Sequence, residues 1–296
     1  MKNVIIDPVM TIEESDKLEG KLLTNRYIGA RNLFRSDVDV YDKETGKCLA
    51  KFRKNVIPGS IQLQAYDSLL IAATATDSRG EAGGEIDGKS STTRIKKDGT
   101  ASKQSIAKNF VNSGIVGYYD RSTRFPNCRL TAFNRHHFDK FEQAYPIIKF
   151  VDNMYKELMP YHYGLQRDQA DSTSKDFVIP NTAFTTVTVN KNWQTAVHKD
   201  VGDFKQGFGN LVALRKGHYD GGYFVLPRWA CGFDLQNGDL LLVDVHQWHG
   251  NTPIVKTTKD AVRLSLVMYY RENMIKCGTM QEELNRVKNR KKGDKL

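Results

Sequence analysis

The sequence has few cysteines, and they form no pattern typical of a structural zinc site or a disulfide framework. The four are Cys48, Cys128, Cys231 and Cys277, and no two stand in a CxxC pair. Small secreted domains and structural zinc sites both need closer, more regular spacing. We therefore expect reduced thiols inside a cell.

Long apolar runs are also missing. No stretch of the 296 residues approaches the roughly 20 apolar positions of a membrane-spanning helix, and residues 1–20 lack the apolar segment of a signal peptide. With 40% hydrophobic and 26% charged residues, the composition is that of a globular protein rather than a disordered or collagen-like one. We expect a soluble intracellular protein without a membrane partner, in the cytoplasm of a prokaryotic or virus-infected cell or in a nucleus.

The motifs of nucleotide-binding α/β folds are absent, and negative charge is the scarcer sign. There is no GxGxxG, no GxxxxGK[ST] and no regular alternation of strands and helices. The chain has 44 Lys and Arg against 34 Asp and Glu, a net charge of +10. Because excess positive charge attracts polyanions, nucleic acid is a candidate partner.

The chain is interpreted as a single domain of three parts. Residues 1–160 form an N-terminal extension of strands and helices, residues 161–275 the catalytic core, and residues 276–296 a basic tail. Within the extension, residues 77–100 hold five glycines and only two large apolar residues, which predicts a flexible loop. Two interpretations of it stay open: an insertion without function, or a loop that orders on a phosphate backbone. Its basic residues are Arg79, Lys89, Arg94, Lys96 and Lys97.

Apolar spacing predicts the secondary structure. Strands are expected at 113–119 and 129–133, and strands with a helix at the short runs 38–41 and 61–63. From Phe138 to Leu158 the spacing is helical, and Pro146 predicts a kink or two consecutive helices. Short strands punctuated by Gly, Asn and Asp then predict a sandwich or jelly roll. These strands lie at 184–190, 209–217, 221–227, 238–245 and 263–271.

Three residues in this strand-rich region have the chemistry of a metal site. His198 and Asp200 form an HxD pair, and residues two apart on a strand face the same side. His249 follows a strong strand and is the preferred third ligand; His246, three residues earlier, competes for that role. Two histidines and one carboxylate on one face of a metal form the site of non-haem iron(II) oxygenases, which leaves positions open for a co-substrate and dioxygen.

A second pattern follows fourteen residues after His249. Arg263 and Ser265 share a face of an alternating strand, opposite Leu264 and Leu266. An arginine can bind a carboxylate with two hydrogen bonds, and a serine hydroxyl can add a third. A buried cation needs an anionic partner, and the distal carboxylate of 2-oxoglutarate would supply one. Each residue alone is more often structural, but the ordered set indicates an oxygenase.

Several segments together resemble the oxygenase domain of the TET/JBP family. They are AVHKDVGDFKQGFGNL, GGYFVLP, GDLLLVDVHQWHGN and RLSLVMYYRE, with upstream elements at Arg79–Gly83, Ser113–Asp120 and Cys128–Phe133. The resemblance covers roughly 79–277. The chain lacks the cysteine-rich region of the animal enzymes and has no room for a separate modified-base-binding domain. It is therefore similar to the compact members of viruses, fungi and protists.

This resemblance implies an α+β fold with a double-stranded β-helix (jelly-roll) core and flanking helices. It implies that His198, Asp200 and His249 bind Fe(II), and that Arg263 and Ser265 bind 2-oxoglutarate. With O2, the enzyme would oxidise the 5-methyl group of a pyrimidine in DNA to 5-hydroxymethyl. Asp203 matches a position that faces the flipped base, where a carboxylate favours 5-methylcytosine over thymine. Other candidates for substrate contact are Arg79, Arg129, Phe204 and Tyr219.

Three alternatives remain open. One is a 2-oxoglutarate oxygenase that hydroxylates a protein side chain or a small metabolite. A second is a non-catalytic jelly-roll module that binds nucleic acid. A third, a zinc hydrolase with the same triad, is disfavoured because hydrolysis has no use for the pair Arg263 and Ser265.

Overall fold

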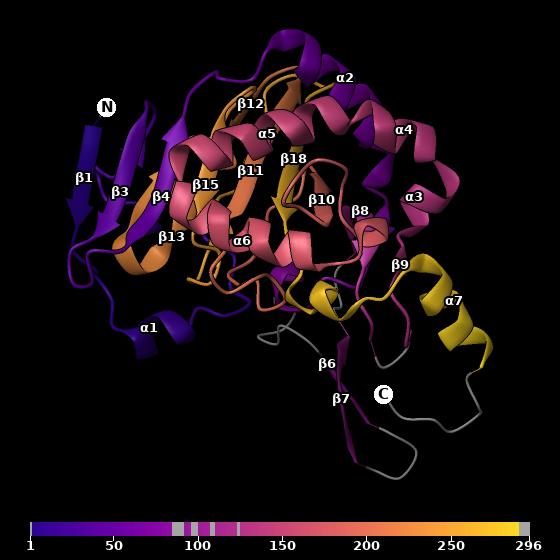
Figure 1. The fold of residues 1–296 in the computed structure, drawn as a ribbon. Helices are drawn as coiled ribbons and strands as arrows, with labels where there is room; N and C mark the ends of the chain where they lie inside the picture. The colour runs from indigo at the N-terminus through magenta and orange to yellow at the C-terminus, as the bar shows by residue number, and fades with distance from the viewer. Residues whose placement is uncertain (1, 85–91, 96–99, 107–109, 123–124, 290–296) are drawn as a thin grey trace.

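A large mixed sheet covered on one face by helices dominates the computed structural model (Figure 1). The structure describes residues 2–84, 92–95, 100–106, 110–122 and 125–289. Across the sheet the strand order is β1 (Lys2–Ile6), β3 (Val38–Asp42), β4 (Cys48–Arg53), β15 (Leu240–Val243), β11 (Gly209–Lys216), β18 (Val262–Tyr269), β10 (Thr186–Lys191), β8 (Val111–Tyr119) and β5 (Ala75–Thr76), with β9 (Arg129–Leu130) paired to β8.

A smaller sheet packs on the face that the helices leave open. Its strand order is β16 (Gly250–Asn251), β13 (Phe224–Leu226), β14 (Cys231–Phe233) and β2 (Leu33–Phe34). Two further pairs are β12 (Tyr219–Gly221) with β17 (Ile254–Lys256), and β6 (Thr92–Ile95) with β7 (Ala101–Ile106). Two sheets packed face to face, with helices outside, confirm the predicted α+β jelly roll.

The alternation of side chains along β11 explains why both faces are covered. Val212 and Leu214 pack into the core beneath the helices, whereas Leu211 and Ala213 pack toward the small sheet. A strand that is apolar on both faces must be buried on both faces, because successive side chains point to opposite sides. On the neighbouring strand β18, Ser265 lies opposite Ala213, so Arg263 and Ser265 lie on the small-sheet side.

The helices confirm the predicted break at Pro146. The spacing beginning at Phe138 gives two consecutive helices, and Pro146 lies in the first turn of the second, where a missing N–H costs nothing. The helices are α1 (Ile12–Asp16), α2 (Gly59–Leu69), α3 (Ala132–His136), α4 (Phe138–Gln143), α5 (Tyr145–Leu158), α6 (Pro160–Ser172) and α7 (Met280–Lys288). Short 3-10 helices, η1 to η6, lie at Asn25–Tyr27, Leu70–Ala72, Gly80–Gly83, Lys175–Phe177, Pro227–Trp229 and Glu272–Lys276.

Strands from the N-terminal part complete the large sheet. β4 pairs with β15 antiparallel, and β3 and β1 continue the sheet beyond it. The short run at 38–41 is β3, and the run at 61–63 lies in α2. The division of the chain at residue 160 stays a prediction, although strands from both sides of it share one sheet.

One local prediction was wrong, and the flexible loop over 77–100 stays a prediction. The strand expected at 129–133 ends at Leu130, because Thr131 accepts a hydrogen bond from the peptide N–H of Asn134 and starts α3. The loop expected over 77–100 contains η3 and the strand β6, which pairs with β7. Residues 85–91 and 96–99, with Lys89, Lys96 and Lys97, lie outside the described residues.

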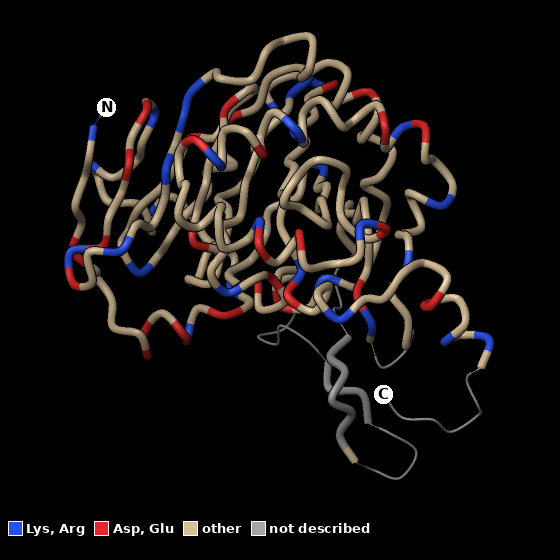
Figure 2. The backbone as a smooth tube through the Cα atoms, viewed as in Figure 1, with Lys and Arg blue, Asp and Glu red and all other residues tan. Residues whose placement is uncertain are grey.

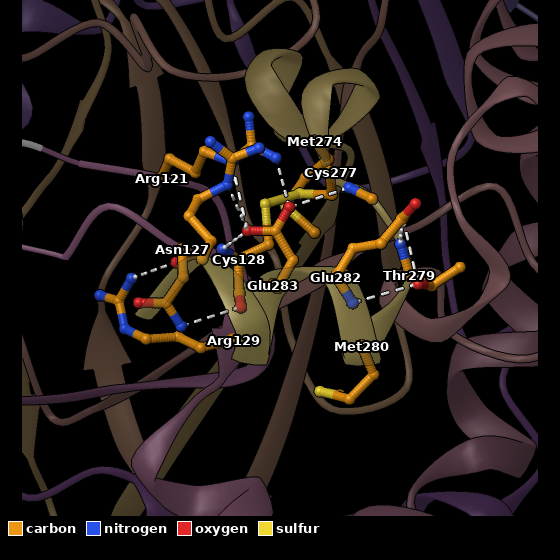
Figure 3. A network of polar contacts seen from close by, with 12 residues as sticks. Arg121, Asn127, Cys128, Arg129, Met274, Cys277, Thr279, Met280, Glu282 and Glu283 are labelled. Atoms are coloured by element: carbon orange, nitrogen blue, oxygen red, sulfur yellow. Dashed lines mark hydrogen bonds and ion pairs between the residues drawn. A yellow bond between two sulfur atoms is a disulfide. The ribbon is translucent and has the colours of Figure 1, made fainter. Parts of the chain in front are cut away.

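The expectation that all cysteines are reduced was also wrong. Cys128 and Cys277 form a disulfide, with Cα atoms 5.8 Å apart (Figure 3). They are 149 residues apart in the sequence, so spacing could not reveal the pair. Pairing depends on the distance between Cα atoms in the fold. Cys48 and Cys231 are free.

Charge is spread over the molecule. Figure 2 shows Lys and Arg interspersed with Asp and Glu along the described backbone, and neither sign occupies a face of its own in this view. Among the described residues, the helices are all too short or too polar to cross a membrane.

Candidate metal centre and adjoining cavities

The three predicted metal ligands lie together. His198 and His249 face each other across an isolated antiparallel bridge, with N–H···O distances of 2.9 and 3.0 Å in the two directions. The Nε2 atom of His198 lies 3.5 Å from one carboxylate oxygen of Asp200, and that of His249 lies 3.8 Å from the other. One potential ligand atom from each residue falls within 4.8 Å of the others. The structure thus brings the HxD pair and His249 to one point.

Backbone carbonyls orient both imidazole rings. Nδ1 of His198 lies 2.8 Å from the carbonyl oxygen of Ala196, and Nδ1 of His249 lies 2.9 Å from that of Gln247. A carbonyl oxygen only accepts hydrogen bonds, so each Nδ1 carries a proton and each Nε2 is directed to the common point. This second contact is the one that orients histidine ligands in metal sites. The donor set fits a divalent metal.

Burial and mutual charge set the protonation of the cluster. Burial and the neighbouring His198 lower the pKa of His249 to about 4, so its ring is neutral near pH 7. Burial alone would raise the pKa of Asp200, but its hydrogen bond to His198 and the charges of both histidines lower it. Burial alone would lower the pKa of His198, and the contacts with Asp200 outweigh it and raise the pKa. At neutral pH, His249 and Asp200 are in the protonation states that bind metals.

His246 is turned away from this point. Its Nε2 lies 3.1 Å from the carbonyl oxygen of Phe204. Within the described residues the ligand cluster contains His249 and not His246. Of the two histidines that competed for the third position, the geometry favours His249.

Arg263 and Ser265 line the same cavity of about 430 Å³ as the three ligands. Both belong to β18 and are buried, with exposed fractions of 3% and 7%. The peptide N–H of Arg263 donates to Asn192 Oδ1 at 2.8 Å, which fixes the backbone, while the buried Nε has no hydrogen-bond partner among the described residues. A buried guanidinium group with an unsatisfied donor requires an anion or another acceptor.

Asp203 lies on the wall of the cavity near Asp200. Its backbone pairs with Arg271 in an isolated bridge, and its buried Oδ2 has no hydrogen-bond partner among the described residues. Burial and the charge of Asp200 raise the pKa of Asp203 well above its ordinary value, which the charge of Arg271 opposes. The cavity therefore contains a second carboxyl group with a free polar atom.

Arg79 reaches the cavity from the N-terminal part. It directly precedes η3, and the carbonyl oxygen of Ala82 in η3 accepts a hydrogen bond from the peptide N–H of Ala196 at 3.0 Å. This contact holds η3 beside the segment that carries His198. Arg79 lines both the 430 Å³ cavity and an adjoining groove of about 810 Å³.

Of the other predicted substrate contacts, none lines the cavity of the metal ligands. Arg129 lies in the groove, with its guanidinium over the rings of Phe125 at 4.1 Å and Tyr119 at 4.8 Å. Phe204 packs edge-on against Tyr270 in the core. Tyr219 is buried near Arg263, whose charge opposes the rise of the tyrosine pKa caused by burial.

The sequence reasoning missed several residues of the cavity. On β18 and just beyond it, Val267, Tyr269 and Arg271 follow Arg263 and Ser265 at every second position and line the cavity with them. Asn190 of β10 also lines it and accepts a hydrogen bond from Ser113 Oγ at 2.5 Å. The period of two along β18 would have identified Tyr269 and Arg271, since every second residue of a strand shares a face.

Fold and site together define a class. A jelly roll that carries two histidines and an aspartate in a cavity, with a buried arginine in the same cavity, is an arrangement of 2-oxoglutarate- and iron-dependent oxygenases. The model of the Tet_JBP family, described as the oxygenase domain of the 2OGFeDO superfamily, matches residues 114–272. The chain belongs to this family, as the sequence resemblance predicted.

Individual relatives agree with the family. The chain is 38% identical over 166 residues to the bifunctional helicase and thymine dioxygenase JBP2 of Leishmania major, a match covering 55% of this chain and 15% of that protein. It is 37% identical over 185 residues to the thymine dioxygenase JBP1 of Trypanosoma brucei brucei, covering 61% and 22%. The chain thus spans less than a quarter of the length of these relatives.

A solved structure shares the fold. NgTET1 in complex with 5mC DNA superposes with a TM-score of 0.58, covering 87% of this chain and 86% of that chain at 15% sequence identity. At this identity the likeness concerns the fold alone.

Proposed function

We propose that this chain is an Fe(II)- and 2-oxoglutarate-dependent dioxygenase that oxidises the 5-methyl group of a pyrimidine in DNA. The observation that carries the proposal is that the His198, Asp200 and His249 cluster shares a single cavity with the buried Arg263, whose Nε has no hydrogen-bond partner among the described residues. Membership of the Tet_JBP family supports it, as do relatives named thymine dioxygenases.

The iron would be held by Nε2 of His198, Nε2 of His249 and a carboxylate oxygen of Asp200. When bound, it supplies the oxidation, in which dioxygen converts 2-oxoglutarate to succinate and carbon dioxide and one oxygen atom enters the methyl C–H bond. The chain directs Nε2 of both imidazoles to the metal position and fixes the rings through the carbonyl oxygens of Ala196 and Gln247.

Arg263 and Ser265 would hold the distal carboxylate of 2-oxoglutarate. The guanidinium presents parallel N–H donors that match a carboxylate, and its burial strengthens the interaction because water cannot screen it. Ser265, two residues along the same face of β18, would donate a further hydrogen bond. This pair orients the co-substrate so that its other end reaches the metal ligands.

Asp203 would read the base, which must leave the duplex because a stacked methyl group cannot reach a buried metal. An acceptor oxygen of its carboxyl group matches the N4 amino group of 5-methylcytosine, whereas thymine presents the acceptor O4 at that position. For this reason 5-methylcytosine is the proposed base, to be converted to 5-hydroxymethylcytosine.

Thymine is the second candidate. The relatives that share more than a third of their residues with this chain over the matched segment are named thymine dioxygenases. The raised pKa of Asp203 also provides for a protonated carboxyl group, whose O–H can donate to thymine O4. A competition experiment with both bases distinguishes between 5-methylcytosine and thymine as the substrate.

The deciding experiment begins with anaerobic reconstitution of the chain with Fe(II) and 2-oxoglutarate. Oxygen is then added together with equal amounts of two DNAs, one that contains 5-methylcytosine and one that contains thymine but no 5-methylcytosine. Nucleoside mass spectrometry then measures both hydroxymethyl products. We expect 5-hydroxymethylcytosine in excess, no product with His198→Ala or Asp200→Ala, and product with the matched control His246→Ala. Asp203→Asn, whose amide can also donate, should shift the ratio toward the thymine product by about tenfold, the worth of one hydrogen bond to a charged group.

Two other outcomes would indicate a different function for the chain. Succinate without a modified base would indicate an oxygenase of protein side chains or metabolites. DNA binding without iron binding or succinate would indicate the non-catalytic module.

A further inference from the structure

A groove adjoins the metal cavity and shares a wall with it. The groove has a volume of about 810 Å³ and lies along β5, β8 and the start of α3. Ser78, Arg79, Tyr269 and Arg271 line both the groove and the cavity. The cavity and the groove therefore lie next to each other, with these four residues between them.

The lining of the groove is cationic. It contains Arg79, Arg129 and Arg271, and no Asp or Glu among the described residues. The metal cavity differs, because Glu81, Asp200 and Asp203 line it. A lining of one sign favours an anionic ligand.

Two of the three arginines keep their charge available. Arg271 is neutralised by Asp120, at 2.8 Å. Arg129 instead donates to the backbone carbonyl oxygens of Asp120 and Asn127, at 3.2 and 3.3 Å, and the Nε of Arg79 has no hydrogen-bond partner among the described residues. Carbonyl groups fix the Arg129 side chain without cancelling its charge, so the groove has two cations ready for an anion such as a phosphodiester.

Flat side chains accompany these charges. The guanidinium of Arg129 lies over Phe125 at 4.1 Å and over Tyr119 at 4.8 Å, and Phe125 is 41% exposed. Aromatic rings and arginine planes beside a cationic track are the elements with which proteins bind unpaired nucleotides, since every base has a face that stacks. The groove offers charge for a phosphate and a plane for a base.

We infer that the groove binds the nucleotide next to the target nucleotide in an unpaired conformation. Its phosphate would contact Arg79 and Arg129, and its base would stack on the layer formed by Phe125 and Arg129. This inference rests on the proposed function and extends it: the substrate is a strand with at least two consecutive unpaired nucleotides, either single-stranded DNA or a duplex opened beyond one base.

Binding can be measured without any chemistry. A fluorescein-labelled hexamer of deoxycytidine, which carries no methyl group, is titrated against the intact chain loaded with Fe(II) and 2-oxoglutarate under anaerobic conditions. We expect Arg129→Ala to weaken binding by at least about fivefold, the lower range for losing one stacked base. Arg129→Lys keeps the charge and loses the planar guanidinium, so its affinity for the hexamer should lie between those of the unmodified chain and Arg129→Ala. The matched control is Arg135→Ala, an exposed arginine on α3 that does not line the groove.

A kinetic series then tests the position of the groove relative to the target. The chain is given 5-methyldeoxycytidine monophosphate and dinucleotides with the methylated base at either end. In one of the two dinucleotides the added nucleotide would lie in the groove, and the KM for that dinucleotide should be at least about fivefold below the KM for the mononucleotide. We expect this decrease in the unmodified chain and in Arg135→Ala, and not in Arg129→Ala. The absorbance of the anaerobic Fe(II)–2-oxoglutarate complex should be the same in all variants.

The inference fails if Arg129→Ala and Arg135→Ala bind the hexamer equally, or if inorganic pyrophosphate displaces the hexamer at the hexamer's own affinity, which would indicate a small-anion site. If the unmodified chain oxidises no base, the proposed function fails, and the hexamer titration still decides for or against the groove.

Discussion

Two polar regions of this molecule satisfy their buried groups in opposite ways. The first, here called the C-terminal clasp, comprises Arg121, Cys128, Cys277 and Glu283 (Figure 3). The carboxylate of Glu283 is 1% exposed, pairs with Arg121, and accepts hydrogen bonds from the peptide N–H groups of Cys128 at 2.8 Å and Gly278 at 2.9 Å. Its donors and acceptors are satisfied within the protein.

In the metal cavity, by contrast, buried polar atoms lack partners among the described residues. They are Nε of Arg79, Nε1 of Trp193, Oδ2 of Asp203 and Nε of Arg263. An unsatisfied buried donor or acceptor costs about 1–3 kcal/mol. A ligand in the cavity would complete these atoms, whereas the polar groups of the clasp are completed by the protein itself.

The largest expected effect is the loss of activity when a residue of the metal cavity is replaced, with little change in stability. His249→Ala should abolish turnover and iron binding, because a divalent metal loses one of its three protein ligands. The thermal midpoint without metal should stay within a few degrees. Iron content after anaerobic loading measures the first effect and calorimetry the second. Normal iron content in this variant would refute the ligand assignment.

The second effect concerns the disulfide of the clasp. The bond closes a loop across 149 residues, and replacing both cysteines with serine should lower the free energy of unfolding by up to about 4 kcal/mol. Denaturant titration under oxidising conditions gives the value, and mass spectrometry of unreduced peptides shows whether the bond forms. Equal stability of the double variant and the oxidised chain would mean that Cys128 and Cys277 do not hold the clasp.

Glu283 should give the third effect. Burial alone would raise its pKa, but Arg121 and the N–H groups of Gly278 and Cys128 lower it. A carboxyl group whose folded pKa is lowered stabilises the protein above its unfolded pKa, and this contribution is lost as the pH falls through the folded value. Glu283→Gln should therefore cost about 3 kcal/mol at pH 7 and much less at pH 3.

Glu282 provides a matched control for this prediction. It is the neighbouring acid, on the exposed side of α7, where it forms a capping box with Thr279. Glu282→Gln should cost about 1 kcal/mol or less. Equal losses in the two variants at both pH values would mean that burial of the Glu283 network is not what stabilises the clasp.

The smallest effect concerns the binding of 2-oxoglutarate alone. Arg263→Lys keeps the charge and loses the two-pronged geometry, so the KM for 2-oxoglutarate should rise by about tenfold while kcat changes less. Arg215→Lys, at the register position beside Arg263 on β11 but outside the cavity lining, is the control. A change in kcat with an unchanged KM would move Arg263 from co-substrate binding to another role.

Local chemistry in the sequence was sufficient for the metal ligands and the co-substrate pair as a hypothesis. His198 and Asp200 stand two apart, as do Arg263 and Ser265, and a strand places such residues on one face whatever surrounds it. The sequence did not decide between His246 and His249 as the third ligand. They are three residues apart just after a strand, and the irregular backbone there could direct either side chain toward the metal. The carbonyl oxygen of Phe204, which holds His246, is visible only in the fold.

The sequence by itself determined the elements and the chemical groups: the helix break at Pro146, the alternating strands, the HxD pair and the arginine on β18. Only the tertiary structure decided which distant groups meet. It joined Cys128 to Cys277, placed Arg79 beside the metal ligands, and placed Arg129 in the adjoining groove instead of the metal cavity. The physical reason is that periodicity acts over a few residues, whereas pairing across a sheet or through a cavity depends on packing of the whole chain.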